Sequence, residues 1–132
     1  MSTDVGSMSL LGTPVSESVD VRRAVNSEYV QDGEITRAAF SSKDLSLDVA
    51  SLCSIDESRS RIPHKFWAEL RCKAFTERGY KPVHDPFEND PRYGTNLAHA
   101  KVPGRINNKT HQRELANEAR QRLFAPLSPV AN

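Results

Sequence analysis

The sequence has little cysteine, almost no net charge and no long apolar run. Eighteen Lys and Arg side chains against seventeen Asp and Glu side chains give the 132 residues a formal charge of +1. Total charge therefore favours neither a nucleic-acid-binding protein nor a membrane-surface protein. Every apolar run is far shorter than the roughly 20 residues that a membrane-spanning helix needs, and the N-terminal stretch has no basic segment of the secretory type. We expect a cytoplasmic protein with no membrane partner.

The absence of familiar motifs excludes several protein classes. Cys53 and Cys72 have neither a Cys-x-x-Cys nor a Cys/His spacing, so two buried thiols are a simpler interpretation than a zinc site or a disulfide framework. The chain also lacks a glycine-rich phosphate loop, a Gly-x-Ser-x-Gly elbow, a His-Glu-x-x-His motif and an acidic calcium loop. These absences exclude most nucleotide-dependent enzymes, elbow-type serine hydrolases and zinc proteases. We expect neither a cofactor nor a bound metal.

The length of the chain fits a single domain with its own core. Residues 1–20 contain no Lys or Arg and no sustained apolar period, so they are predicted to form a flexible N-terminal arm. Residues 21–124 are predicted to form one small α+β domain, with a mainly antiparallel sheet packed by two helices. Residues 125–132, which are punctuated by Pro126 and Pro129, are predicted to form a flexible C-terminal tail.

Strand signals come from the first half of the domain. The run "LSLDVASL" at residues 45–52 alternates apolar and less apolar side chains, which is the period of a half-buried strand. Residues 35–40 are also expected to be extended, and the short gap between the two runs fits an antiparallel hairpin. The Asp-Gly pair at 32–33 predicts a tight turn because Gly accepts positive φ. Residues 21–30 fit two or three turns of helix.

Helix signals come from the second half. Apolar side chains recur every four positions over residues 111–124, which predicts an amphipathic helix with Asn108 or Thr110 as its N-cap. Another helix is expected to end near Arg78, and the segment 66–72 before it fits either helix or a strand that enters a shorter helix. The side chains expected in the core are Leu47, Val49, Phe66, Leu70, Phe75, Leu115 and Leu123.

The strongest local anomaly is the segment 91–113, which contains no Asp or Glu. Its cationic and imidazole side chains are Arg92, His99, Lys101, Arg105, Lys109, His111 and Arg113. Cations of this density can neutralise phosphates, and Tyr93 is available to stack on a base. One hypothesis is therefore RNA binding, with Arg92, Tyr93, Lys109 and Arg113 as binding residues.

The same segment holds the groups that metal-independent RNA cleavage needs. In this hypothesis His99 and His111 exchange protons with the substrate, and Lys101 and Arg105 stabilise the phosphorane. No fixed motif defines that chemistry, and most charge runs are solvated faces. His99 lies between two alanines, so a half-buried structural histidine is the competing interpretation.

A metal site is a further alternative. His84, Asp85, Glu88 and Asp90 are suitable ligand types, but they lack a helical or strand spacing that would converge them. His84 and Asp85 also fit a loop in which a carboxylate or carbonyl orients the ring.

An interaction module explains the sequence with the fewest assumptions. A small domain without an active-site motif, with an acidic arm and a basic C-terminal half, is typical of a binding protein rather than an enzyme. The first hypothesis is an adaptor or regulatory protein that docks on another protein, as a hetero-complex, through its terminal arms and a basic patch. The alternative is a metal-independent ribonuclease or an RNA-binding protein.

Overall fold

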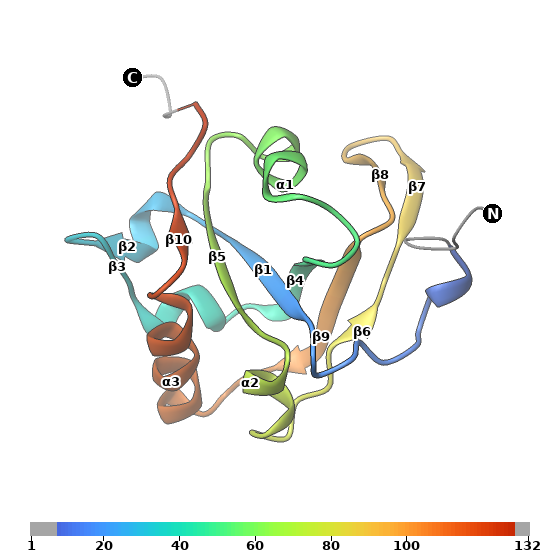
Figure 1. Ribbon diagram of the computed structural model, residues 1–132. Helices are drawn as coiled ribbons and strands as arrows, with labels where there is room; N and C mark the ends of the chain where they lie inside the picture. The colour runs from blue at the N-terminus through green and yellow to red at the C-terminus, as the bar shows by residue number, and fades with distance from the viewer. Residues whose placement is uncertain (1–7, 129–132) are drawn as a thin grey trace.

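An antiparallel sheet of six strands organises the chain in the computed structural model, which describes residues 8–128 (Figure 1). In sheet order the strands are β10 (Leu123–Phe124), β5 (Phe66–Arg71), β1 (Asp20–Val25), β4 (Lys43–Val49), β9 (His99–Arg105) and β6 (Val83–His84). Every neighbouring pair is antiparallel. This sheet and the helices around it confirm the predicted α+β class.

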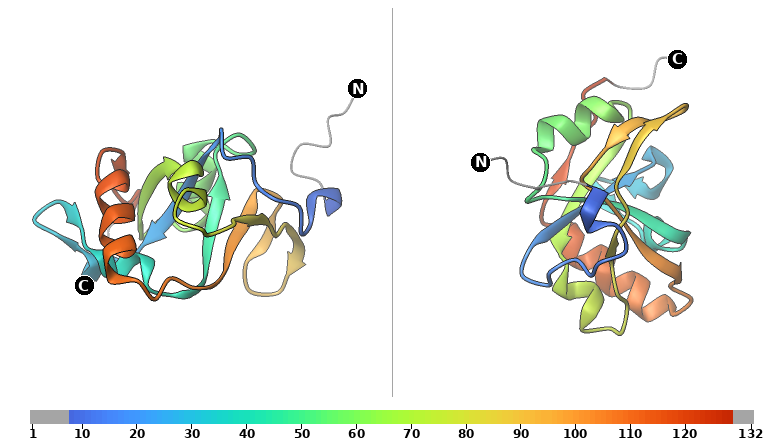
Figure 2. Two further views of the ribbon diagram at one scale, coloured as in Figure 1. Left: turned by 90° about the horizontal axis from the view of Figure 1, so that it is seen from below. Right: turned by 90° about the vertical axis from the view of Figure 1, so that its right-hand side faces the viewer.

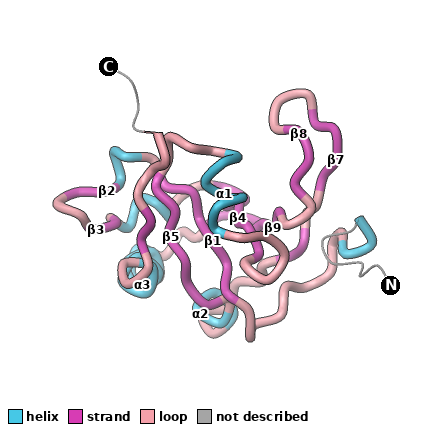
Figure 3. The backbone as a smooth tube through the Cα atoms, turned by 45° about the horizontal axis from the view of Figure 1, so that its top comes forward, coloured by secondary structure: helices cyan, strands magenta, loops and turns pink. Residues whose placement is uncertain are grey.

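Helices and two small hairpins complete the fold (Figure 3). The hairpins are β2 (Val30–Gln31) with β3 (Glu34–Ile35), and β7 (Phe87–Asp90) with β8 (Gly94–Asn96). The α-helices are α1 (Ile55–Arg61), α2 (Lys73–Thr76) and α3 (Lys109–Ala119), and the 3-10 helices are η1 (Met8–Leu10), η2 (Ser27–Tyr29) and η3 (Arg37–Phe40).

The sheet has one apolar face and one polar face because side chains alternate along each strand. The apolar face packs against α2, α3 and η3, and its core includes Val21, Leu47, Leu70, Ala100 and Leu115, all 1% exposed or less. The polar face presents Arg22, Ser46, Asp48, Glu69 and His99, which the strand register places side by side. Figure 3 shows α1 and the β7–β8 hairpin on the same side of the molecule, away from α2 and α3.

Several sequence predictions hold. The strand predicted over 45–52 is β4, although it spans Lys43–Val49. Asp32 and Gly33 form the predicted turn with φ of 55° and 78°. Asn108 caps α3, since its side chain accepts a hydrogen bond from the His111 backbone N–H at 2.9 Å. Of the seven predicted core residues, five are buried, and Phe66 and Leu123 are partly buried against the core.

Two predictions of local structure are wrong. Residues 21–30 do not form a helix, because Val21 and Val25 belong to the central strand β1, which pairs on both sides. The strand predicted over 35–40 ends at Ile35, and η3 follows. Ala39 and Phe40 are both buried. Consecutive side chains of a strand point to opposite faces, so two consecutive buried side chains fit a helical turn better than a half-buried strand.

The second half of the domain differs at its helix ends. The open question over 66–72 is answered by a strand, β5, that leads into the short helix α2. The helix predicted over 111–124 ends at Ala119, because the chain then returns to the sheet as β10 and the Arg122 carbonyl accepts a hydrogen bond from the Glu69 N–H.

The described parts of both predicted arms contact the domain. Gly12 and Thr13 exchange backbone hydrogen bonds of 2.8 Å with His84 of the edge strand β6, and Val15 is buried. At the other end, the Ser128 N–H donates to the Pro63 carbonyl at 2.9 Å. The predictions for residues 1–7 and 129–132 lie outside the described residues. Within residues 8–128, no helix has the length and apolar character needed to cross a membrane.

Candidate functional site

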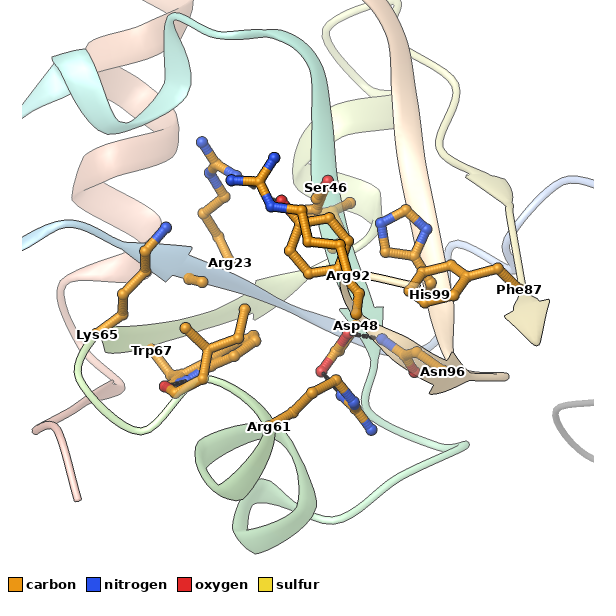
Figure 4. Close-up of a pocket in the computed structure, with 14 residues that line it drawn as sticks. Arg23, Ser46, Asp48, Arg61, Lys65, Trp67, Phe87, Arg92, Asn96 and His99 are labelled. Atoms are coloured by element: carbon orange, nitrogen blue, oxygen red, sulfur yellow. Dashed lines mark hydrogen bonds and ion pairs between the residues drawn. The ribbon is translucent and has the colours of Figure 1, made fainter. Parts of the chain in front are cut away.

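A cavity of about 340 Å³ opens on the polar face of the sheet (Figure 4). We call it the sheet pocket. Its walls come from strands β1, β4, β5 and β9, from the end of α1 and the turn after it, and from the β7–β8 hairpin. The side chains used below are those of Arg23, Ser46, Asp48, Arg61, Lys65, Trp67, Phe87, Arg92, Tyr93, Asn96 and His99.

Asp48 holds the base of the pocket together. It is only 3% exposed, and its Oδ1 accepts a hydrogen bond from Asn96 Nδ2 at 2.9 Å. Its Oδ2 accepts from Ser58 Oγ at 2.6 Å and from Arg61 Nη1 at 2.8 Å. One buried carboxylate thereby links α1 and β8 to β4, and its charge is balanced by Arg61.

The helix α1 is set in place by a local sequence signal. Ser54 accepts a hydrogen bond from the Glu57 N–H at 3.1 Å, and the Glu57 carboxylate accepts one from the Ser54 N–H at 2.8 Å. This capping box satisfies two donors at the helix start. These bonds also lower the pKa of Glu57. The helix start is thereby fixed, and Ser58 and Arg61 reach Asp48 from it.

Three cations of the pocket have no carboxylate partner within residues 8–128. They are Arg23, Lys65 and Arg92. Arg23 donates only to neutral oxygens, the carbonyls of Ala39 and Ser46 and the Ser42 hydroxyl. Uncompensated cations gathered at one cavity attract an anion.

Dehydration adds to the electrostatic cost of these cations. Burial lowers the pKa of Arg23 to about 10. Burial also lowers the pKa of Lys65, and the positive charge of Arg23 lowers it further. Both effects disfavour the charged forms in the unliganded pocket, and an anion between the two side chains would relieve them.

The tip of the β7–β8 hairpin presents a cation and an aromatic ring together. The Asp90 carboxylate accepts hydrogen bonds from the N–H groups of Arg92 and Tyr93 at 2.8 and 2.9 Å, which fixes the turn. The Arg92 guanidinium lies 5.1 Å from the centre of the Tyr93 ring, and Tyr93 is 54% exposed. An exposed aromatic beside a cation is suited to stacking on a planar ligand.

His99 faces the pocket from β9 with a fixed orientation (Figure 4). Its Nδ1 lies 3.0 Å from the Asp85 carbonyl oxygen and 3.2 Å from the Asp85 carboxylate. Its ring packs edge to face against the Phe87 ring, with 5.2 Å between the ring centres. A carbonyl can only accept, so Nδ1 carries the hydrogen and the Nε2 of the neutral ring is left with a free lone pair. His99 is therefore half-buried and anchored, but it is not sealed in the core.

The structure does not bring His99 and His111 together. His111 lies on α3, where its Nδ1 is 2.6 Å from the Tyr80 hydroxyl. His99 points to the polar face, whereas α3 covers the apolar face of the sheet. Figure 2 shows α3 and the β7–β8 hairpin at opposite ends of the molecule. A two-imidazole mechanism with this pair has no support in the geometry.

The other basic residues predicted from the sequence are also divided. Lys101 is on the same face of β9 as His99 but does not line the pocket, and the Arg105 guanidinium donates to the Ser41 carbonyl at 3.0 Å. Lys109 and Arg113 are exposed on α3. Of the four predicted binding residues, only Arg92 and Tyr93 line the sheet pocket.

Neither a metal cluster nor an activated thiol forms among the described residues. His84, Asp85, Glu88 and Asp90 do not converge, and no group of three or more His, Cys, Asp or Glu within residues 8–128 could hold a metal ion. Cys53 and Cys72 are buried and free, and burial raises both thiol pKa values, that of Cys72 to about 11. Neither thiol is a thiolate nucleophile at neutral pH.

Sequence reasoning missed Arg23, Asp48, Lys65 and Trp67. Two signals were available. The alternation in "LSLDV" places Ser46 and Asp48 together on the solvated face, and "SIDE" at 54–57 is a capping-box pattern that indicates a helix start. The convergence of Arg23 and Lys65 depends on strand order, which local patterns do not reveal.

No family model, no curated protein and no solved structure matches this chain. No relative therefore supplies a function for the sheet pocket.

Proposed function

We propose that this protein binds single-stranded RNA and holds one nucleotide in the sheet pocket. The observation that carries the proposal is the set of three cations without carboxylate partners among the described residues, Arg23, Lys65 and Arg92. A phosphate placed among them would compensate charges that the folded chain otherwise leaves unpaired and partly dehydrated.

The other walls of the pocket suit the rest of a nucleotide. A cavity of about 340 Å³ is at the lower end of the size range of small-ligand sites. Tyr93 offers an exposed ring beside Arg92, and every nucleobase has a face that can stack on it. Stacking of this kind requires a base that is not already stacked in a duplex, which favours single strands.

The ribose hydroxyl is the feature that favours RNA over DNA. The free lone pair of His99 Nε2 can accept a hydrogen bond from a 2′-hydroxyl, and the exposed Ser46 hydroxyl lines the same pocket. DNA lacks that donor, and the 2′-hydroxyl is the group by which proteins tell the two nucleic acids apart.

Docking on a protein partner stays a prediction. Its sequence rationale was a basic patch and a pair of arms free to bind, but Gly12 and Thr13 bond to His84 of β6 and the Ser128 N–H bonds to Pro63. These contacts favour the sheet pocket over the described parts of the arms as the functional element. The basic side chains of α3, Lys109 and Arg113, are exposed outside the sheet pocket and are available to a protein partner.

A cytoplasmic location belongs to the same proposal. Cys53 and Cys72 are both free, and free thiols are the state that reducing compartments maintain. RNA is accessible there.

The proposal is tested by fluorescence anisotropy with a labelled, mixed-sequence single-stranded RNA. Lys65→Ala and Arg92→Ala each remove a charged contact to phosphate, so each should raise Kd about tenfold, which corresponds to about 1.4 kcal/mol. The matched controls, Lys109→Ala and Arg113→Ala, remove a cation from α3 and should leave Kd within about twofold. An equal rise in Kd for the pocket variants and the α3 variants, or no RNA binding by the wild type, would overturn the proposal.

A further inference from the structure

We propose that the sheet pocket also cleaves the RNA it binds, with His99 as the general base and Lys65 as the general acid of an in-line attack by the 2′-oxygen on phosphorus. This proposal rests on the proposed RNA binding. It differs from the two-imidazole hypothesis, because the proton donor is Lys65 of the pocket and not His111 of α3.

His99 is held in the form that a general base requires. The Asp85 carbonyl, 3.0 Å from Nδ1, accepts the Nδ1 hydrogen and leaves Nε2 as the free acceptor. The Asp85 carboxylate lies 3.2 Å from the same nitrogen, so it would form an ion pair with the imidazolium after Nε2 takes up a proton. Phe87 packs against the ring at 5.2 Å and limits its rotation.

The nucleophile must come with the substrate. Within residues 8–128 no side-chain hydroxyl or thiol is hydrogen-bonded to His99, whose side-chain partner is Asp85. Cys53 and Cys72 are buried with raised thiol pKa values, so neither is an activated nucleophile. RNA carries its own nucleophile, the 2′-hydroxyl, on the sugar carbon adjacent to the carbon that bears the scissile phosphate.

The two proposed groups lie on opposite sides of the pocket. In Figure 4, Lys65 and Trp67 form one side, and His99 and Phe87 form the other. An in-line displacement needs this arrangement, because the entering and leaving oxygens lie on opposite sides of phosphorus. Burial and the charge of Arg23 lower the pKa of Lys65, which makes its ammonium a better proton donor than an exposed lysine.

The atoms balance without a further reactant. His99 Nε2 takes the proton of the 2′-hydroxyl, the 2′-oxygen forms a bond to phosphorus, and the bond from phosphorus to the 5′-oxygen breaks. The leaving 5′-oxygen takes a proton from Lys65 Nζ. The products are a 2′,3′-cyclic phosphate and a 5′-hydroxyl, and solvent then returns His99 and Lys65 to their starting forms. Arg23 and Arg92 stabilise the charge on the phosphorane oxygens.

The experiment follows a 5′-labelled single-stranded RNA incubated with the purified full chain in chelator, with products identified by mass spectrometry. The wild type should yield 2′,3′-cyclic phosphate ends. His99→Ala should lower the rate about 10²–10⁴-fold, and the control His111→Ala should retain the wild-type rate. An oligonucleotide with a single 2′-deoxy residue at the cleaved position should bind but resist cleavage there.

Lys65 is tested with a substrate whose 5′-bridging oxygen is replaced by sulfur. A thiolate leaves without protonation because thiols are far more acidic than alcohols. Lys65→Arg retains the charge, so it should bind RNA yet cleave the ordinary substrate at least about 10²-fold more slowly. The sulfur substrate should restore its rate, but it should not restore the rate of His99→Ala.

Binding measured in parallel separates the two proposals. Tight, pocket-dependent binding without cleavage by the wild type would overturn the cleavage proposal and leave RNA binding intact, whereas loss of both would overturn both. Cleavage that survives in His99→Ala would also overturn it. If His99→Ala does not melt like the wild type, the 2′-deoxy substrate is tested with the wild type and the sulfur substrate with the wild type and Lys65→Arg. Cleavage by the wild type at the 2′-deoxy position, at the rate seen with the all-RNA substrate, would contradict the mechanism.

Discussion

At the scale of single residues, Asp48 is the side chain on which the pocket depends most. It accepts hydrogen bonds from Ser58 and Arg61 of α1 and from Asn96 of β8, and it is nearly fully buried. Removal of its carboxylate leaves the Arg61 charge and two polar groups without their acceptor. The pocket and the stability of the fold are therefore coupled at this residue.

Asp48→Ala is expected to lower the free energy of unfolding by about 3–5 kcal/mol, which is the usual cost of removing one partner of a buried ion pair and leaving the other without its counter-charge. Urea denaturation measures the change. The control is Asp56→Asn, an exposed carboxylate in the first turn of α1, which should cost less than about 1 kcal/mol. Similar losses in both variants would show that Asp48 is not the link between α1, β4 and β8.

His84 should make stability depend on pH. It is 9% exposed, its Nδ1 has no hydrogen-bond partner, and burial lowers its pKa. The unfolded chain therefore binds this proton more readily than the folded chain does, so stability is complete above the unfolded value of about 6.5 and falls as pH decreases below it.

Thermal melts from pH 7.5 to 5 measure this dependence. The wild type should lose Tm as pH falls, and His84→Gln should lose less over the same range. The exposed His64 provides the control, since His64→Gln should retain the wild-type dependence. Parallel curves for the wild type and His84→Gln would contradict the role given to His84.

At the scale of elements, sequence patterns identified what depends on near neighbours. The turn at Asp32-Gly33, the Asn108 cap and the alternating strand β4 follow from local rules of backbone geometry and burial. The helix α3 was also visible from its apolar period.

The elements that the sequence did not reveal are those that the rest of the fold determines. In β1, Arg22 and Arg23 obscure the period of two, and Arg22 is buried only because Glu69 and the Cys53 carbonyl accept its hydrogen bonds at 2.9 Å. β10 exists because the chain after α3 pairs with β5. The structure divides the predicted site residues for the same reason, since Arg92 and His99 share a pocket while His111 lies on α3.

The core packing of the elements can be tested with two leucines. Leu47 of β4 and Leu115 of α3 are fully buried in the core between the sheet and the helices. Leu47→Ala and Leu115→Ala should therefore each lower the free energy of unfolding by about 2–5 kcal/mol. Leu127, which is 47% exposed, is the control, and Leu127→Ala should change stability by less than about 0.5 kcal/mol. Melts of the core variants that match the wild type would contradict this packing.

At the scale of the whole molecule, the near-neutral total charge conceals an uneven distribution. Carboxylates pair with many of the arginines, as in Arg22–Glu69, Arg61–Asp48 and Arg122–Asp20. The sheet pocket, by contrast, has four cationic side chains and a single carboxylate among its lining residues. A net charge of +1 is therefore compatible with a local anion site, and RNA binding should depend less steeply on salt than it does for strongly basic proteins.

The central claim is that phosphate is held by the cations of the sheet pocket, and the salt dependence of RNA binding tests it most directly. For a single strand, the slope of log K against log salt concentration changes by about 0.7 for each phosphate that a cation of the protein neutralises. Lys65→Ala should therefore have a slope smaller by about that amount than the wild type, and Lys109→Ala should have the wild-type slope. A slope unchanged in Lys65→Ala, or reduced equally in Lys109→Ala, would contradict the claim.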